Sequence, residues 1–150
     1  MKHYAPRPSQ EARPVLERLD PFQARVVAHL RWWSDGPSGQ DMVRLDYRTA
    51  LGAAETEEAV GLLDAVITLV GDNARRPLKR QQSGCQCIGS DEALFARLVA
   101  LAGHHLHEDA TRIAAELVTG ARAEQMAILA AGLGRYMKCL KPHVRPARLH

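Results

Sequence analysis

Apolar residues recur every three or four positions along most of the chain between residues 20 and 140. This spacing is typical of amphipathic helices, which turn one face toward the core. Glycine and proline divide the pattern into six segments, at about 20–33, 40–51, 56–70, 91–102, 107–118 and 122–140. No window alternates long enough to predict a strand. We therefore predict an all-α fold, an irregular orthogonal bundle of five or six short helices with no β-sheet.

Polar residues that can cap helices stand before several of these segments. Asp20 precedes Pro21, with Gln23 three residues further on, and this order predicts the start of the first helix. Serine and threonine accept hydrogen bonds from the free N–H groups of a first turn. On that ground we predict N-caps for the second, third and fourth helices at Ser38, Thr56 and Ser90.

The third segment has the widest apolar surface, because apolar residues cover most of its circumference. We expect it to be the most buried helix, with only a narrow polar row in solvent. That row consists of Glu57, Gly61, Asp64 and Thr68.

Composition and charge suggest one domain with a terminal extension at each side. The proline-rich residues 1–14 predict an extended arm, residues 15–140 a single helical domain, and residues 141–150 a basic tail. The net charge of +3 is uneven, since residues 72–84 carry +3 and residues 121–150 carry +5, whereas residues 15–71 carry −4. Positive charge therefore concentrates in a connector and at the ends.

The N-terminal residues, the apolar runs and the cysteine count predict a cytoplasmic location. The first residues have no apolar stretch ahead of a cleavage site, and no apolar run reaches the roughly 18–20 residues that cross a membrane. Three cysteines is an odd number, and it does not suggest a disulfide framework. We expect a cytoplasmic protein without membrane contact.

Thiols and imidazoles bracket the fourth helix. Cys85 and Cys87 precede it, and three histidines, His104, His105 and His107, follow it. These ligand types suit zinc, but residues 91–102 span roughly 18 Å as a helix and zinc–ligand bonds are only about 2.0–2.3 Å. The five residues therefore form two separate candidate clusters. Each would need ligands from elsewhere, such as Cys139, His143 or a second subunit, and zinc stays the candidate cofactor.

The two thiols also allow redox chemistry, because a cysteine near a helix N-terminus can have a stabilised thiolate. A disulfide between Cys85 and Cys87 would be strained and easily reduced, which suits a sensor. We expect the third cysteine, Cys139, to be a small buried residue near the end of the last helix.

Two basic segments are candidates for contact with nucleic acid or an acidic partner. The residues are Arg75, Arg76, Lys79 and Arg80 in the connector and Lys138, Lys141, Arg145 and Arg148 near the C-terminus. They lie among few aromatic residues, so contact would be with phosphates and sensitive to salt. The helix pair around Gly52 resembles a helix-turn-helix, but Glu55, Glu57 and Glu58 in its second helix would repel DNA.

Catalytic motifs are missing from the chain. No phosphate-binding glycine loop and no Gly-x-Ser-x-Gly occurs. The run from His105 to Asp109 resembles the start of the metallo-β-lactamase metal motif, but Ala110 stands at its last histidine, so we exclude that family.

We expect a small helical binding or regulatory module rather than an enzyme. The alternative is a nucleic-acid-associated regulator that uses the connector 75–80 and the C-terminal tail. A protein or nucleic-acid partner fits either hypothesis. Trp32 and Trp33 point in different directions on their helix, so one is expected to pack and the other allows a homodimer.

Overall fold

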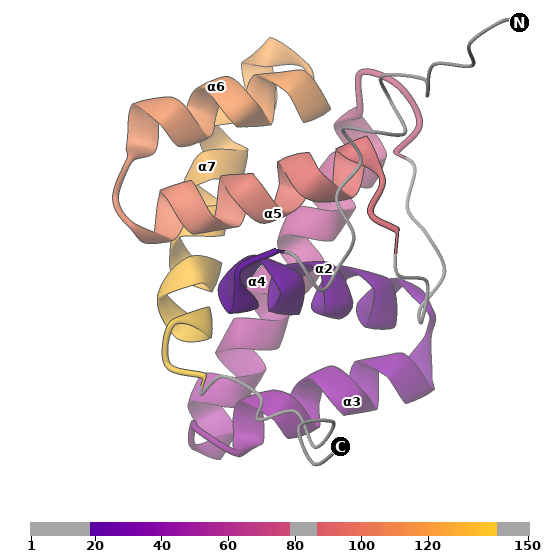
Figure 1. Ribbon diagram of the computed structural model, residues 1–150, viewed down its shortest axis with the longest axis vertical. Coiled ribbons are helices and arrows are strands. Elements are labelled where there is room, and N and C mark those ends of the chain that lie inside the picture. Colours follow the sequence, from indigo (N-terminus) through magenta and orange to yellow (C-terminus); the bar gives the residue numbers. More distant parts are fainter. Residues whose placement is uncertain (1–18, 79–86, 141–150) are drawn as a thin grey trace, which may run out of the picture.

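The computed structural model describes residues 19–78 and 87–140, and these form six helices. The helices are α2 (Pro21–Ser34), α3 (Pro37–Arg48), α4 (Ala53–Asn73), α5 (Ser90–Gly103), α6 (His107–Leu117) and α7 (Gly120–Met137). In Figure 1, α4 and α7 run along the long axis, and α2, α3, α5 and α6 cross them. The predicted all-α bundle is confirmed. The predicted arm 1–14 and tail 141–150 lie outside the described residues.

The first helix begins as predicted, and the second does not. The Asp20 side chain accepts a hydrogen bond from the Gln23 N–H at 2.8 Å, so Asp20 is the N-cap of α2. The predicted cap at Ser38 is wrong, because α3 already begins at Pro37 behind Gly36. Gly36 has a φ of 110°, which is accessible to glycine, and proline has a φ suited to the first helical position.

Helix α4 is longer than its apolar pattern predicts. It begins at Ala53, three residues before the predicted cap, and Thr56 lies inside it with a fully buried side chain. The predicted polar row of α4 is exposed as expected. The most buried helix is nevertheless α5, because its first turn carries Asp91 and Glu92 into the interior with its apolar side chains.

Helix α5 also begins one residue earlier than expected. Gly89 occupies the N-cap position, and Ser90, the predicted cap, is the first helical residue and is exposed. The backbone N–H of Gly89 donates to Oε1 of Glu92 at 3.0 Å, which makes a carboxylate the capping partner.

A glycine contact sets the crossing of α5 and α7. A Cβ atom on Gly134 would lie 2.7 Å from the Cα of Gly103 and 2.9 Å from the carbonyl oxygen of Val99. Both neighbours are backbone atoms, which cannot rotate away. The two helices therefore approach this closely only because neither has a side chain at the crossing.

One apolar core cluster takes residues from all six helices. Trp33 packs into it, and its indole N–H donates to Oδ1 of Asp64 at 2.9 Å, while Trp32 is half-buried. Ala74 and Val118 form an isolated antiparallel bridge. No helix in the described ranges is long and apolar enough to cross a membrane.

Candidate functional site

A fully buried ion pair joins α2 to the start of α5. Nε of Arg31 donates to Oε2 of Glu92 at 2.8 Å, and an Nη2 hydrogen bond of 2.8 Å reaches Oε1 of the same carboxylate. Side-chain exposure is 2% for Arg31 and 0% for Glu92. Nη2 also donates to the carbonyl of Cys87 at 2.8 Å. This geometry holds the backbone of Cys87, the second cysteine of the Cys85–Cys87 pair, against the core.

A second ion pair lies beside the first and involves the basic connector. Nη2 of Arg76 contacts Oδ1 of Asp91 at 2.5 Å, with Asp91 buried and Arg76 about half exposed. Arg76 also donates to the carbonyl of Glu116, and Arg75 donates to the carbonyl of Ala115 at 2.8 Å. Both arginines thus hold carbonyls at the C-terminal end of α6, where positive charge is favourable.

The other end of α5 is closed by its backbone. The N–H of Leu106 bonds to the carbonyl of Leu101 and that of His105 to the carbonyl of Ala102, which is the pattern of a Schellman motif. His105 occupies the position that usually holds glycine, with a φ of 64°. Nζ of Lys138 donates to the carbonyl of Gly103 at 2.5 Å.

The candidate metal ligands do not converge in the described part of the chain. Cys87 lies before α5, and His104, His105 and His107 are exposed beyond its other end. In the described ranges, no group of three or more His, Cys, Asp or Glu residues is placed to hold a metal ion. Cys85 lies outside these ranges, so a zinc site that includes it stays a prediction.

Both described cysteines lie at exposed positions. Cys87 and Cys139 are free and exposed. The expectation that Cys139 is buried is therefore wrong, because α7 ends at Met137 and Cys139 lies in the turn that follows.

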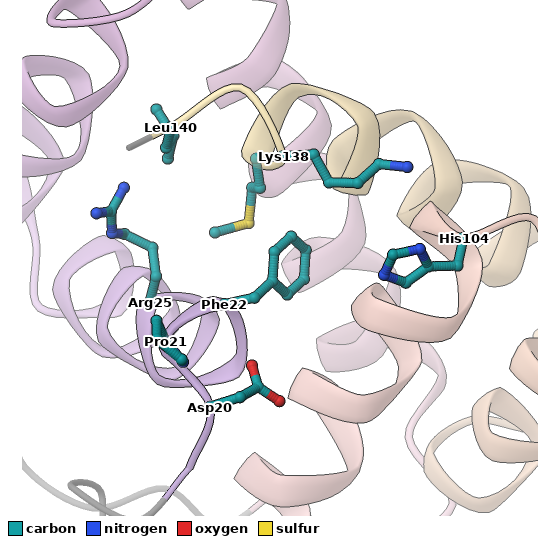
Figure 2. Close-up of a pocket in the computed structure, with 8 residues that line it drawn as sticks. Asp20, Pro21, Phe22, Arg25, His104, Lys138 and Leu140 are labelled. Carbon is teal, nitrogen blue, oxygen red and sulfur yellow. The ribbon is translucent and has the colours of Figure 1, made fainter. Parts of the chain in front are cut away.

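A pocket of about 410 Å³ opens where the start of α2 meets the C-terminal ends of α5 and α7. It has an apolar floor and several charged groups at its edge. The lining residues are Asp20, Pro21, Phe22, Arg25, His104, Met137, Lys138 and Leu140. Figure 2 shows Phe22 between Arg25 on one side and His104 on the other, with the Lys138 amine extending toward the His104 side.

A buried polar cluster lies behind the Arg25 side of this pocket. Oδ2 of Asp46 is 3.7 Å from Nε of Arg25 and 2.8 Å from Nε2 of His29, which is fully buried. The His29 ring packs edge-on against Tyr47 at a centroid distance of 5.3 Å. Burial raises the pKa of Tyr47 well above its usual value, with a smaller contribution from Asp46, so its hydroxyl stays protonated.

Three of the residues predicted to bind an acidic partner already have partners within the chain. Arg75 and Arg76 bind the end of α6, and Lys138 binds the end of α5. The remaining candidates, Lys79, Arg80, Lys141, Arg145 and Arg148, lie outside the described residues. The predicted basic surface stays a prediction. In the structure, Arg75 and Arg76 stabilise the C-terminal end of α6.

Arg31 and Glu92 were not among the sequence-based candidates, and of the pocket lining only His104 and Lys138 were, for other roles. One signal for the ion pair was available, because Arg31 follows Val27 by four residues and Leu30 by one on a strongly apolar stretch. A charged residue at such a position must find a partner when the helix packs. The pocket had no comparable signal, because its lining comes from three helices far apart in sequence.

Comparison of the chain with family models, curated proteins and solved structures finds no match in any of the three.

Proposed function

We propose that this protein is a cytoplasmic, non-catalytic binding module that holds a small organic anion in the pocket between α2, α5 and α7. The observation that carries the proposal is the lining of the pocket. Phe22, Met137 and Leu140 supply apolar surface. Of the charged lining residues, Arg25 is paired with Asp46 at 3.7 Å, so the groups that face a ligand are the Lys138 ammonium and the Asp20 carboxylate. Ligand pockets of roughly 300–1,000 Å³ combine an apolar lining with a few polar groups in this way.

The hydrogen-bonding groups of the lining favour a carboxylate with an apolar body over a neutral or cationic molecule. The one acidic residue in the lining, Asp20, already accepts a hydrogen bond from Gln23 as the cap of α2. Lys138 donates one hydrogen bond, to the carbonyl of Gly103, and an ammonium group has three donors. The Lys138 amine can therefore donate to the carbonyl of Gly103 and to a ligand carboxylate at the same time.

Matched probes test this function. We expect octanoate to raise the melting temperature and to shift backbone amide NMR signals of the lining residues, while octylamine and octanol at the same concentration do so much less. Lys138→Met should weaken octanoate binding at least about tenfold, since a hydrogen bond to a charged group contributes about 1.5–3 kcal/mol. Arg122→Met, which removes an exposed cation at the start of α7, is the matched control. Equal responses to the three probes would refute the proposal.

A regulatory role remains part of this proposal. A ligand that contacts both Lys138 and His104 would touch the C-terminal end of α5. The loop before the N-terminal end of the same helix contains Cys87, whose carbonyl is held by Arg31. A metal- or redox-responsive Cys-x-Cys loop stays a prediction, as does the nucleic-acid alternative, for which the described residues provide no additional support.

A further inference from the structure

The outward surface of α3 carries the most exposed large apolar side chain among the described residues. Leu45 is 65% exposed and Met42 is 48% exposed. In Figure 1, α3 lies at the edge of the bundle, and it packs mainly on α2 and α4. Val43 and Tyr47, on the opposite side of α3 from Leu45, are fully buried. Met42 and Leu45 are three residues apart and adjoin on the outward side of α3, and contiguous exposed apolar surface is where proteins associate.

Two opposite charges flank Leu45 on one side of this surface. At about 100° per residue, Asp41 and Arg48 both lie roughly 40–60° from Leu45 in one direction around the axis, and Met42 and Thr49 lie in the other. Asp41 is 82% exposed, and its Oδ1 lies 4.0 Å from Nη1 of Arg44. Arg48 is exposed as well.

The order of these residues makes the surface complementary to itself. Asp41 lies about 6 Å before Leu45 along the axis, and Arg48 about 4.5 Å after it. A two-fold axis through Leu45 reverses this order in the second copy and keeps each residue on its own side. Asp41 then faces Arg48 of the other copy, Arg48 faces Asp41, and the two Leu45 side chains meet at the axis.

We propose that the outward face of α3 is a homodimer contact, in which α3 of one copy lies antiparallel to α3 of a second copy across Leu45. The contact takes only one helix face from each copy, so it falls in the class below about 1,200 Å² that forms weak, reversible dimers. Met42 packs beside Thr49 of the second copy at the edge. The inference is independent of the pocket, which lies between other helices.

Sedimentation equilibrium from micromolar to millimolar protein tests the contact. We expect wild type to dimerise reversibly in this range and Leu45→Glu to remain monomeric. Asp41→Arg alone and Arg48→Asp alone should each weaken association about tenfold, because either change creates two like-charge contacts per dimer. The double variant Asp41→Arg with Arg48→Asp should restore association to near the wild-type value.

Ile128→Glu on α7 is the matched control, since Ile128 is 58% exposed on a different helix. Circular dichroism of each variant checks that the fold is intact. The proposal is overturned if wild type is monomeric at the highest concentration, if Ile128→Glu dissociates the dimer as strongly as Leu45→Glu, or if the double reversal fails to restore association.

Discussion

The two ends of α5 use their polar residues in opposite ways. At the N-terminal end, Asp91 and Glu92 are buried and bound to arginines. At the C-terminal end, His104 and His105 are exposed, and backbone hydrogen bonds and Lys138 close the helix. The described candidate ligands, Cys87 and the three histidines, are thus exposed, while ordinary charged residues form the buried network.

This difference has a physical origin. A buried charge must be paired, so the arrangement at the N-terminal end is specific and each partner depends on the other. Exposed imidazoles form their hydrogen bonds with water, so they do not require a partner at a fixed position in the protein. We therefore expect substitutions at the N-terminal end to lower the free energy of unfolding most. A substitution at the backbone contact between the C-terminal end and α7 should lower it less, and a change at His105 should raise it.

The largest effect is expected for Arg31→Met. It leaves the Glu92 carboxylate buried without its guanidinium, and such a change costs about 3–5 kcal/mol of unfolding free energy. Urea denaturation measures the loss. Arg31→Met combined with Glu92→Met should recover more than half of it, because the uncompensated charge is then gone. Arg112→Met, at an exposed pair with Asp109, should cost less than about 1 kcal/mol. If Arg31→Met costs no more than Arg112→Met, the buried pair does not hold the two helices.

A smaller effect is expected where α5 crosses α7. Gly134→Ala places a methyl group against the backbone of Gly103, so we expect a loss of about 1–3 kcal/mol in the same denaturation measurement. Gly61→Ala is the matched control, because Gly61 is also helical but has open space around it. That change should stabilise the protein by about 0.5–1 kcal/mol. Effects of the same sign for both variants would contradict the close crossing.

The smallest effect, and a favourable one, is expected for His105→Gly. A non-glycine residue at positive φ costs about 1–2 kcal/mol, part of which glycine loses again through its freer unfolded chain. The net gain should be about 0.5–1 kcal/mol, seen as a higher melting temperature. His104→Gly provides the comparison, since its φ of −98° suits any residue and the substitution should bring no gain. A loss on His105→Gly would mean that the imidazole makes a contact worth more than the backbone strain.

The sequence predicted the helices better than their ends. The cap at Asp20 is confirmed because a carboxylate, a proline and Gln23 act within one turn. The caps at Ser38, Thr56 and Ser90 were wrong, because glycine with a suitable backbone begins each of these helices earlier. Side-chain capping propensity is a small energy that backbone and packing can override.

Local pattern alone determined the all-α class, the exposed polar row of α4 and the separation of Cys87 from the imidazoles. These properties depend on helical periodicity and on rise per residue, which any window of the chain contains. Only the tertiary structure decided which charges are buried and which helix ends meet at the pocket. Arg31 and Glu92 are 61 residues apart, and no local rule joins them. Such contacts come from how helices pack, because burial and pairing are properties of two surfaces together and not of either sequence segment.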